Sequence, residues 1–143
     1  MSTVAMPASR PWHLWVVAIL TLLWNGSGAV TIMLAQAGRL TGLSADEAAY
    51  YAGQPAWFVI STDIATLAPV AAAIALLVRS QLAVWLFALS LALILVNNIY
   101  DLALGTSRAL ANQGALIVTV IIAVIAILQL VYSNAMKNRG VLR

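Results

Sequence analysis

Four long apolar runs, separated by short polar segments, make up most of this chain. Each run holds about twenty residues, the length that a helix needs to cross ~30 Å of hydrocarbon at ~1.5 Å per residue. We therefore predict an all-α fold, a four-transmembrane-helix bundle. The crossings are expected at about residues 12–34, 57–78, 82–104 and 115–133.

The polar segment between the first two runs carries the pattern of a short helix at about 45–52. Ser44 can cap the start of this helix, and Glu47, three residues later, can close a capping box. Gly53 can end the helix just before Pro55. Because so short a helix cannot cross a membrane, we expect it to lie along the external interface.

Two further features concern the middle of the chain. Pro69 lies near the centre of the second crossing, where it predicts a kink or a local unwinding. The short segment Arg79–Gln81 predicts a tight turn, which makes the second and third crossings antiparallel neighbours. Ala68 and Ala72 belong to a stripe of small residues spaced four apart, and such stripes let helix backbones approach closely in lipid.

The composition agrees with a single membrane domain over residues 1–143. Hydrophobic residues make up 64% of the chain and charged residues 8%, whereas soluble domains carry about 25% charged residues. Cysteine is absent from the sequence, which excludes disulfides, thiolate metal sites and thiol chemistry. The net charge of +3 comes from basic residues in short tails and loops. Because these residues form no cluster, they indicate membrane topology and no nucleic-acid binding.

The distribution of basic residues predicts the orientation in the membrane. Four crossings place both termini on one side, and most of the basic residues lie on that side: Arg10, Arg79, Lys137, Arg139 and Arg143. The opposite side holds only Arg39 and Arg108. Because Lys and Arg favour the cytoplasmic side, we expect cytoplasmic termini. In a bacterium the membrane would be the inner one.

The polar side chains within the crossings gather in the half next to the external face. They come from helices that run in alternating directions, yet they converge on one level. Asp101 lies three residues after Asn98 and four after Asn97, so it shares a helix face with each of them. We therefore predict a ligand-binding layer formed by Asn25, Asp63, Thr66, Asn97, Asn98, Tyr100 and Asp101.

Asp63 is the member of this layer that a structural role explains least well. An ionised carboxylate at mid-membrane costs about 2.5–3.5 kcal/mol on insertion scales, so such groups normally face the bundle interior or a wet cavity. No Lys or Arg lies within the crossings to pair with it. Asp63 must then be hydrated, hydrogen-bonded, protonated or bound to a cation. The alternative is a structural pairing with the Asn side chains or with an arginine of the loops.

Other polar residues also have structural interpretations. Asp101, near a helix end, could lie at the water interface. The asparagines could join helices through hydrogen bonds worth about 0.6–2 kcal/mol each, and we expect this of at least one. His13, beside Trp12 and Trp15 at the opposite interface, is typical of an anchor in the headgroup zone.

Several stretches resemble a group of small, largely uncharacterised bacterial four-helix membrane proteins that are often labelled sugar transporters. The stretches are PWHLWVVAILTLLWNGSGA, YYAGQPAW, RSQLAVWLFALSLALILV and AMKNRGVLR. In that group a Trp-Asn-x-x-Gly motif in the first helix precedes an Asp-Tyr pair and a Met-Thr-Gln. Trp24, Asn25 and Gly28 match the motif here. Val30 and Thr31 replace the Asp-Tyr pair, and only Met33 and Gln36 match the remainder.

Two functions remain open from the sequence. Polar groups on kinked helices near one end of a bundle are typical of a carrier for a small solute or cation, which with four helices would work as a homodimer. The plain fourth crossing and the small-residue stripe would equally suit an accessory or scaffold subunit of a larger membrane complex. An enzyme is not expected. No metal-ligand set or cofactor motif is present, and His13 lies at the opposite face from the polar layer.

Overall fold

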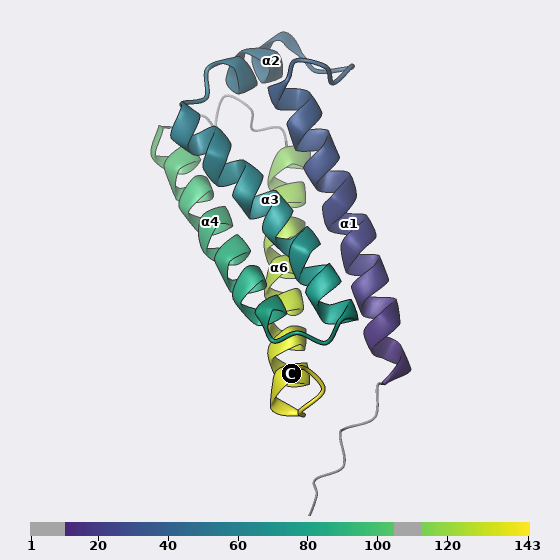
Figure 1. The fold of residues 1–143 in the computed structure, drawn as a ribbon. Helices are drawn as coiled ribbons and strands as arrows, with labels where there is room; N and C mark the ends of the chain where they lie inside the picture. The colour runs from purple at the N-terminus through teal and green to yellow at the C-terminus, as the bar shows by residue number, and fades with distance from the viewer. Residues whose placement is uncertain (1–10, 105–112) are drawn as a thin grey trace, which may run out of the picture.

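A computed structural model describes residues 11–104 and 113–143, and these ranges contain five α-helices and no strand. The helices are α1 (Trp12–Gln36), α2 (Ala45–Ala52), α3 (Ala56–Leu77), α4 (Leu82–Leu104) and α6 (Gln113–Asn138). Figure 1 shows the four long helices side by side as a bundle, with α2 across one end. The predicted all-α bundle with four crossings and a short extra helix is therefore confirmed.

The four long helices have the length and apolar character of membrane spans. The mean hydropathy of their most apolar windows runs from 1.7 in α1 to 2.3 in α6. Large apolar side chains on their outer faces are exposed, as lipid-facing residues are; Leu95 of α4 and Val120 of α6 are examples. The chain is an integral membrane protein.

The helices pack in chain order around an open arc. Within the described part of the chain, α3 packs against both α1 and α4, and α4 packs against α6. The end of the bundle that carries Arg79, Lys137, Arg139 and Arg143 is called the basic end below, and the opposite end is called the α2 end. The C-terminus lies at the basic end (Figure 1).

Small residues allow the helices to approach closely near the basic end. Ala72 of α3, Ala18 of α1 and Ala83 of α4 are completely buried, and they pack with Leu76 and Phe87 in one core cluster. A helix that presents only methyl groups brings its backbone nearer to its neighbour, which increases dispersion contacts in lipid. Of the predicted small-residue stripe of α3, Ala68, Ala72 and Ala75 are buried in the bundle, whereas Ala71 is exposed.

Pro69 does not interrupt α3, which stays helical from Ala56 to Leu77. Proline has no amide hydrogen, so the carbonyl four residues earlier, that of Ala65, loses its partner within the helix. Ser90 of α4 replaces this partner, because its hydroxyl donates a hydrogen bond of 2.6 Å to the Ala65 carbonyl oxygen. The helix is therefore not unwound at Pro69, and the neighbouring helix satisfies the freed carbonyl. The kink, the other outcome that the sequence left open, stays a prediction.

The last residues fold back under the bundle. Gly140, at φ 68°, ends the turn that follows α6, and Val141 and Leu142 are buried in the core cluster. The Arg79 guanidinium donates to the Val141 carbonyl at 2.7 Å, and the Arg143 amide donates to the Arg79 carbonyl at 2.6 Å. The C-terminal tail is thereby attached to the tight turn between α3 and α4.

The short helix α2 begins with the predicted capping box. The Glu47 amide donates to the Ser44 hydroxyl at 3.2 Å, and the Ser44 amide donates to a Glu47 carboxylate oxygen at 2.8 Å. Gly53 lies at the C-cap and donates its amide to the Ala49 carbonyl. Both ends of α2 thus lie where the sequence predicted them.

The end of α6 differs from the prediction, and two segments of the chain lie outside the described residues. α6 continues to Asn138, five residues beyond the expected end at Ser133, because Met136 still packs into the core cluster. The expected loop 105–114 lies largely outside the described residues, and Arg108 lies within it. The N-terminal segment 1–10, with Arg10, also lies outside the described residues.

Candidate functional site

The polar level predicted in the α2-end half is centred on Asn97. This residue of α4 is 8% exposed. Its side-chain oxygen accepts a hydrogen bond of 2.8 Å from the Ser61 hydroxyl, and its amide donates at 3.1 Å to the Thr62 hydroxyl. Both partners belong to α3. Asn97 therefore joins two crossings, as expected of at least one asparagine.

Three other predicted residues bond to their own helices. The amide of Asn25 donates to the Thr21 carbonyl at 2.8 Å, and that of Asn98 donates to the Ile94 carbonyl at 2.9 Å. The Thr66 hydroxyl donates to the carbonyls of Thr62 and Asp63. Asn98 is exposed on the outer surface of α4, so the structure does not place it beside Asn97 at the interface with α3.

Asp63 keeps one carboxylate oxygen without a partner. The side chain as a whole is half-buried, but its Oδ1 atom is buried and has no hydrogen bond within the described part of the chain. Buried polar atoms without partners are rare in proteins, and each needs an explanation such as a bound ligand, ion or water. Asp63 is therefore the predicted site residue with unused binding capacity.

Tyr100 and Asp101 lie at the α2 end and hold the outer elements together. The Tyr100 ring packs edge-on against Trp57, with 4.7 Å between ring centroids, and also contacts Phe58. The Tyr50 hydroxyl of α2 donates a hydrogen bond of 2.9 Å to Asp101. Burial, together with the negative charge of Asp101, raises the pKa of Tyr50, so this hydroxyl stays protonated as a donor.

The structure thus brings the seven predicted residues to one half of the bundle but not into one cluster. Asn97 bonds across the α3–α4 interface and Asp101 bonds to α2. Asn25, Asn98 and Thr66 bond to their own helices, and Tyr100 packs on aromatic neighbours. The Oδ1 atom of Asp63 has no partner among the described residues. Their role as a ligand-binding layer stays a prediction.

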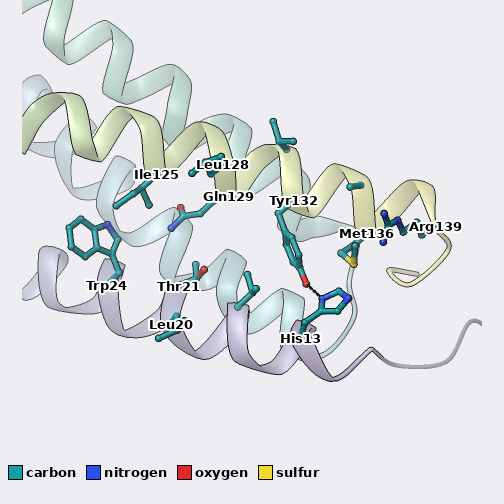
Figure 2. Close-up of a pocket in the computed structure, with 13 residues that line it drawn as sticks. His13, Leu20, Thr21, Trp24, Ile125, Leu128, Gln129, Tyr132, Met136 and Arg139 are labelled. Atoms are coloured by element: carbon teal, nitrogen blue, oxygen red, sulfur yellow. Dashed lines mark hydrogen bonds between the residues drawn. The ribbon is translucent and has the colours of Figure 1, made fainter.

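A groove between α1 and α6 was not predicted from the sequence. Its volume is about 760 Å³, within the ~300–1,000 Å³ typical of small-molecule sites. Figure 2 shows side chains from both helices pointing into it. Residues of α1 and α6, together with Arg139 just after α6, line it: His13, Val17, Leu20, Thr21 and Trp24 from α1, and Ile125, Leu128, Gln129, Val131, Tyr132, Ala135 and Met136 from α6.

The polarity of the groove changes along its length. Arg139 lies exposed at the basic end. Next to it His13 Nδ1 and the Tyr132 hydroxyl are hydrogen-bonded at 2.7 Å, which joins α1 to α6 at this end (Figure 2). Toward the middle of the bundle the walls are apolar, with Trp24 and Ile125 facing each other across the groove.

Two polar side chains lie between these regions. Thr21, 6% exposed, and Gln129, half-buried, point into the groove from opposite sides (Figure 2). Neither side chain hydrogen-bonds to another residue in the described part of the chain. Trp24 and Leu128 remain 46% and 61% exposed, so the groove is open sideways to the surrounding lipid.

The sequence held a signal for this groove. His13, Thr21 and Trp24 recur at helical spacing on one face of α1, and Gln129, Tyr132 and Met136 do so on one face of α6. Trp24 lies at the middle of the bundle beside Asn25, and the other residues of the groove lie in the half opposite the predicted layer. Residue spacing could not show that α1 and α6 face each other at a distance, because that depends on how α3 and α4 pack between them.

Comparison with known proteins adds no relative, since no family model, curated protein or solved structure matches this chain. The resemblance to small four-helix bacterial proteins stays a prediction.

Proposed function

We propose that this membrane protein binds an amphiphilic molecule in the groove between α1 and α6. The observation that carries the proposal is the order of polarity along the groove: a cation at the basic end, hydrogen-bonding groups next, and apolar walls toward mid-membrane. A molecule with a polar head and an apolar body matches this order. The side opening lets such a molecule enter directly from the bilayer.

The amphiphile fits better than a helix from another protein. A partner helix in this half of the membrane would bring an apolar face against both walls, and the buried Thr21 and half-buried Gln129 would then need matching polar groups. A small molecule with a polar group near its head supplies such groups directly. The apolar walls gain dispersion contacts with the body of either occupant.

Binding, and not catalysis, is the role that the groove supports. His13 and the Tyr132 hydroxyl are hydrogen-bonded to each other and join α1 to α6, and the groove walls toward mid-membrane are apolar. In the described residues no group of three or more His, Asp or Glu could hold a metal ion. We therefore propose a protein that binds its ligand without transforming it.

We also propose that the basic end faces the cytoplasm, in a bacterium across the inner membrane. All four acidic residues lie in the opposite half or its loops. Arg79, Lys137, Arg139 and Arg143 lie at the basic end, as the preference of Lys and Arg for the cytoplasmic side requires. The end of the groove that carries His13 and Arg139, called its mouth below, then lies in the cytoplasmic leaflet.

The test fills the groove from either wall. Leu20→Trp and Leu128→Trp each place a large ring in it, whereas Leu23→Trp places the same ring on the exposed face of α1 outside it. Native mass spectrometry of the full chain, purified in mild detergent with a membrane lipid extract, measures bound amphiphile. We expect one amphiphile per protein in the wild type and in Leu23→Trp, and at least about tenfold less in the two blocking variants.

Three outcomes would overturn this proposal. The first is equal amphiphile retention in all variants. The second is a partner protein that purifies in equal amount and is lost only in the blocking variants, which would support the accessory-subunit function. The third is a dimer that becomes a monomer in those variants, which would assign the groove to a second copy.

A small-solute site at the α2 end is the second candidate function, and unpaired polar atoms favour it. A cavity of about 230 Å³ lies under α2, between the end of α1 and Tyr51. Gln36 lines this cavity, and its Nε2 atom is buried without a hydrogen-bond partner in the described residues. This donor can bind an acceptor group of a small polar solute. Asp63 does not line this cavity, and its unpaired Oδ1 atom can accept from a donor group of a solute or bind a cation in the same half of the bundle.

Thermal stability in the presence of ligands tests this second candidate. A ligand that binds only the folded protein stabilises it by RT ln(1 + L/Kd), where L is the free ligand concentration. A solute or cation bound through Asp63 should therefore raise the melting temperature of the wild type and not that of Asp63→Asn. Asn98→Ala serves as the control, since Asn98 is exposed and bonds to its own helix. An equal response in Asp63→Asn would remove Asp63 from the site.

A further inference from the structure

We infer that the ligand of the α1–α6 groove is a phosphate-bearing anionic lipid from the leaflet at the basic end, with Arg139 as its headgroup contact. This inference rests on the proposed function and adds the chemical class of the ligand. It depends on three observations: the extent of the groove, the charge at its mouth, and the half-buried amide of Gln129.

The groove covers the depth of one leaflet. Trp24 follows His13 by eleven positions along α1, which at a rise of ~1.5 Å per residue is roughly 16 Å. The hydrocarbon core of a bilayer is ~30 Å thick, so the groove covers about half of it. An acyl chain that starts at the basic end can therefore lie along the groove without leaving its own leaflet.

The charge at the mouth selects an anionic head. Arg139 lines the groove and is exposed, while none of the thirteen described residues that line the groove is acidic. A guanidinium group can donate two parallel hydrogen bonds to phosphate oxygens. A lipid without net charge gains less from this contact, since the charge that the described residues place at the mouth is positive.

The other basic side chains at this end have different neighbours. The Arg79 guanidinium donates to the Val141 carbonyl, and the Lys137 ammonium lies 5.9 Å from the centre of the Trp85 ring. Arg143 is exposed and does not line the groove. Among the described basic residues, Arg139 is therefore the one that lies at the mouth.

Gln129 provides a hydrogen bond deeper in the groove. It lies between Arg139 and the apolar section, and its amide makes no hydrogen bond to another described residue. In a glycerolipid the ester carbonyl oxygens follow the phosphate and precede the acyl chains. The order guanidinium, amide and apolar wall in the protein thus matches the order phosphate, ester and acyl chain in the lipid.

Competition between two lipids tests this inference on the full chain. The protein is exchanged in detergent into an equimolar mixture of phosphatidylglycerol and phosphatidylcholine with identical acyl chains, and native mass spectrometry counts each bound lipid. One Lys or Arg near an anionic membrane surface strengthens binding to that surface by about fivefold. We therefore expect a preference for phosphatidylglycerol of at least about fivefold, lost in Arg139→Gln and kept within about twofold in Arg143→Gln.

The blocking variant separates failure of this inference from failure of the proposed function. Leu20→Trp should reduce retention of both lipids. Equal retention of the two lipids, unaffected by Arg139→Gln but reduced by Leu20→Trp, would overturn the anionic class and keep the groove as the site. Displacement of the lipid by soluble glycerol 3-phosphate would show that the phosphate alone is recognised, and would overturn a lipid as the ligand.

Discussion

Single polar side chains hold these apolar helices together, and Ser90 shows how one can replace a missing backbone hydrogen bond. Its hydroxyl, 2% exposed, serves the Ala65 carbonyl that Pro69 leaves without a partner. Ser90→Ala should lower the free energy of unfolding by about 1–3 kcal/mol, the effect of leaving a buried acceptor unpaired. Unfolding in mixed detergent micelles measures this change.

A second variant, Pro69→Ala, tests whether the effect of Ser90→Ala depends on the missing amide of Pro69. An alanine at this position would restore the amide that bonds to the Ala65 carbonyl, so Ser90→Ala should then destabilise the protein much less. A double-mutant cycle measures the coupling between the two positions. Additive effects in the cycle would contradict the proposed replacement.

Asn97 and Asn98 are neighbours in sequence with different surroundings. Asn97 bonds to Ser61 and Thr62 of α3, whereas Asn98 bonds to its own helix and is exposed. Asn97→Ala should lower the free energy of unfolding by about 1–2 kcal/mol, because two interhelical hydrogen bonds are lost. Asn98→Ala should leave it unchanged or raise it, as measured by the same micelle unfolding. Equal effects of both variants would contradict this assignment.

At the scale of elements, local rules account for what the sequence predicted. Both ends of α2 follow from Ser44, Glu47 and Gly53, because caps depend on residues a few positions apart. The hydrogen bond that replaces the missing amide of Pro69 comes instead from Ser90 on another helix. The end of α6 likewise depends on how Met136 packs into the core cluster. Such contacts join distant parts of the chain, so local patterns could not reveal them.

The stability of α2 should depend on pH through Glu47. Hydrogen bonds from the backbone amide and the hydroxyl of Ser44 lower the pKa of Glu47 below its ordinary value of 4.5. Because the folded-state pKa is the lower one, the contribution of Glu47 is present above about pH 4.5 and is lost as the pH falls through the folded pKa. We expect faster amide exchange across α2 in that acidic range, and no such pH step in Glu47→Gln. An unchanged pH step in this variant would assign it to another group.

At the scale of the whole molecule, the four crossings and their antiparallel order could be predicted, since helix length and turn length determine them. The groove could not, because α1 and α6 are placed by their contacts with α3 and α4. The residues of the predicted layer lie in one half of the bundle, yet Asn97 bonds to α3 whereas Asn98 bonds to its own helix and is exposed. Depth follows from residue number, whereas the direction of a side chain depends on the rotation of its helix.

The proposed orientation predicts which end of the molecule meets the outside. The protein has no cysteine, so single cysteines can be introduced at two exposed positions, Asp46→Cys in α2 and Arg143→Cys at the basic end. A membrane-impermeant maleimide added to intact cells should label Asp46→Cys alone, and permeabilised cells should label both. Labelling of Arg143→Cys in intact cells would reverse the orientation.

The α1–α6 groove as a binding site is the central claim, and photo-crosslinking tests it most directly. A lipid with a photoreactive acyl chain is added at low mole fraction to the full chain in nanodiscs, and mass spectrometry locates the crosslinks. We predict that they concentrate on Leu20, Trp24 and Leu128, which line the groove, over exposed leucines elsewhere such as Leu23 of α1, at 64%, and Leu95 of α4, at 50%. Crosslinks spread evenly over all lipid-facing residues would contradict the claim.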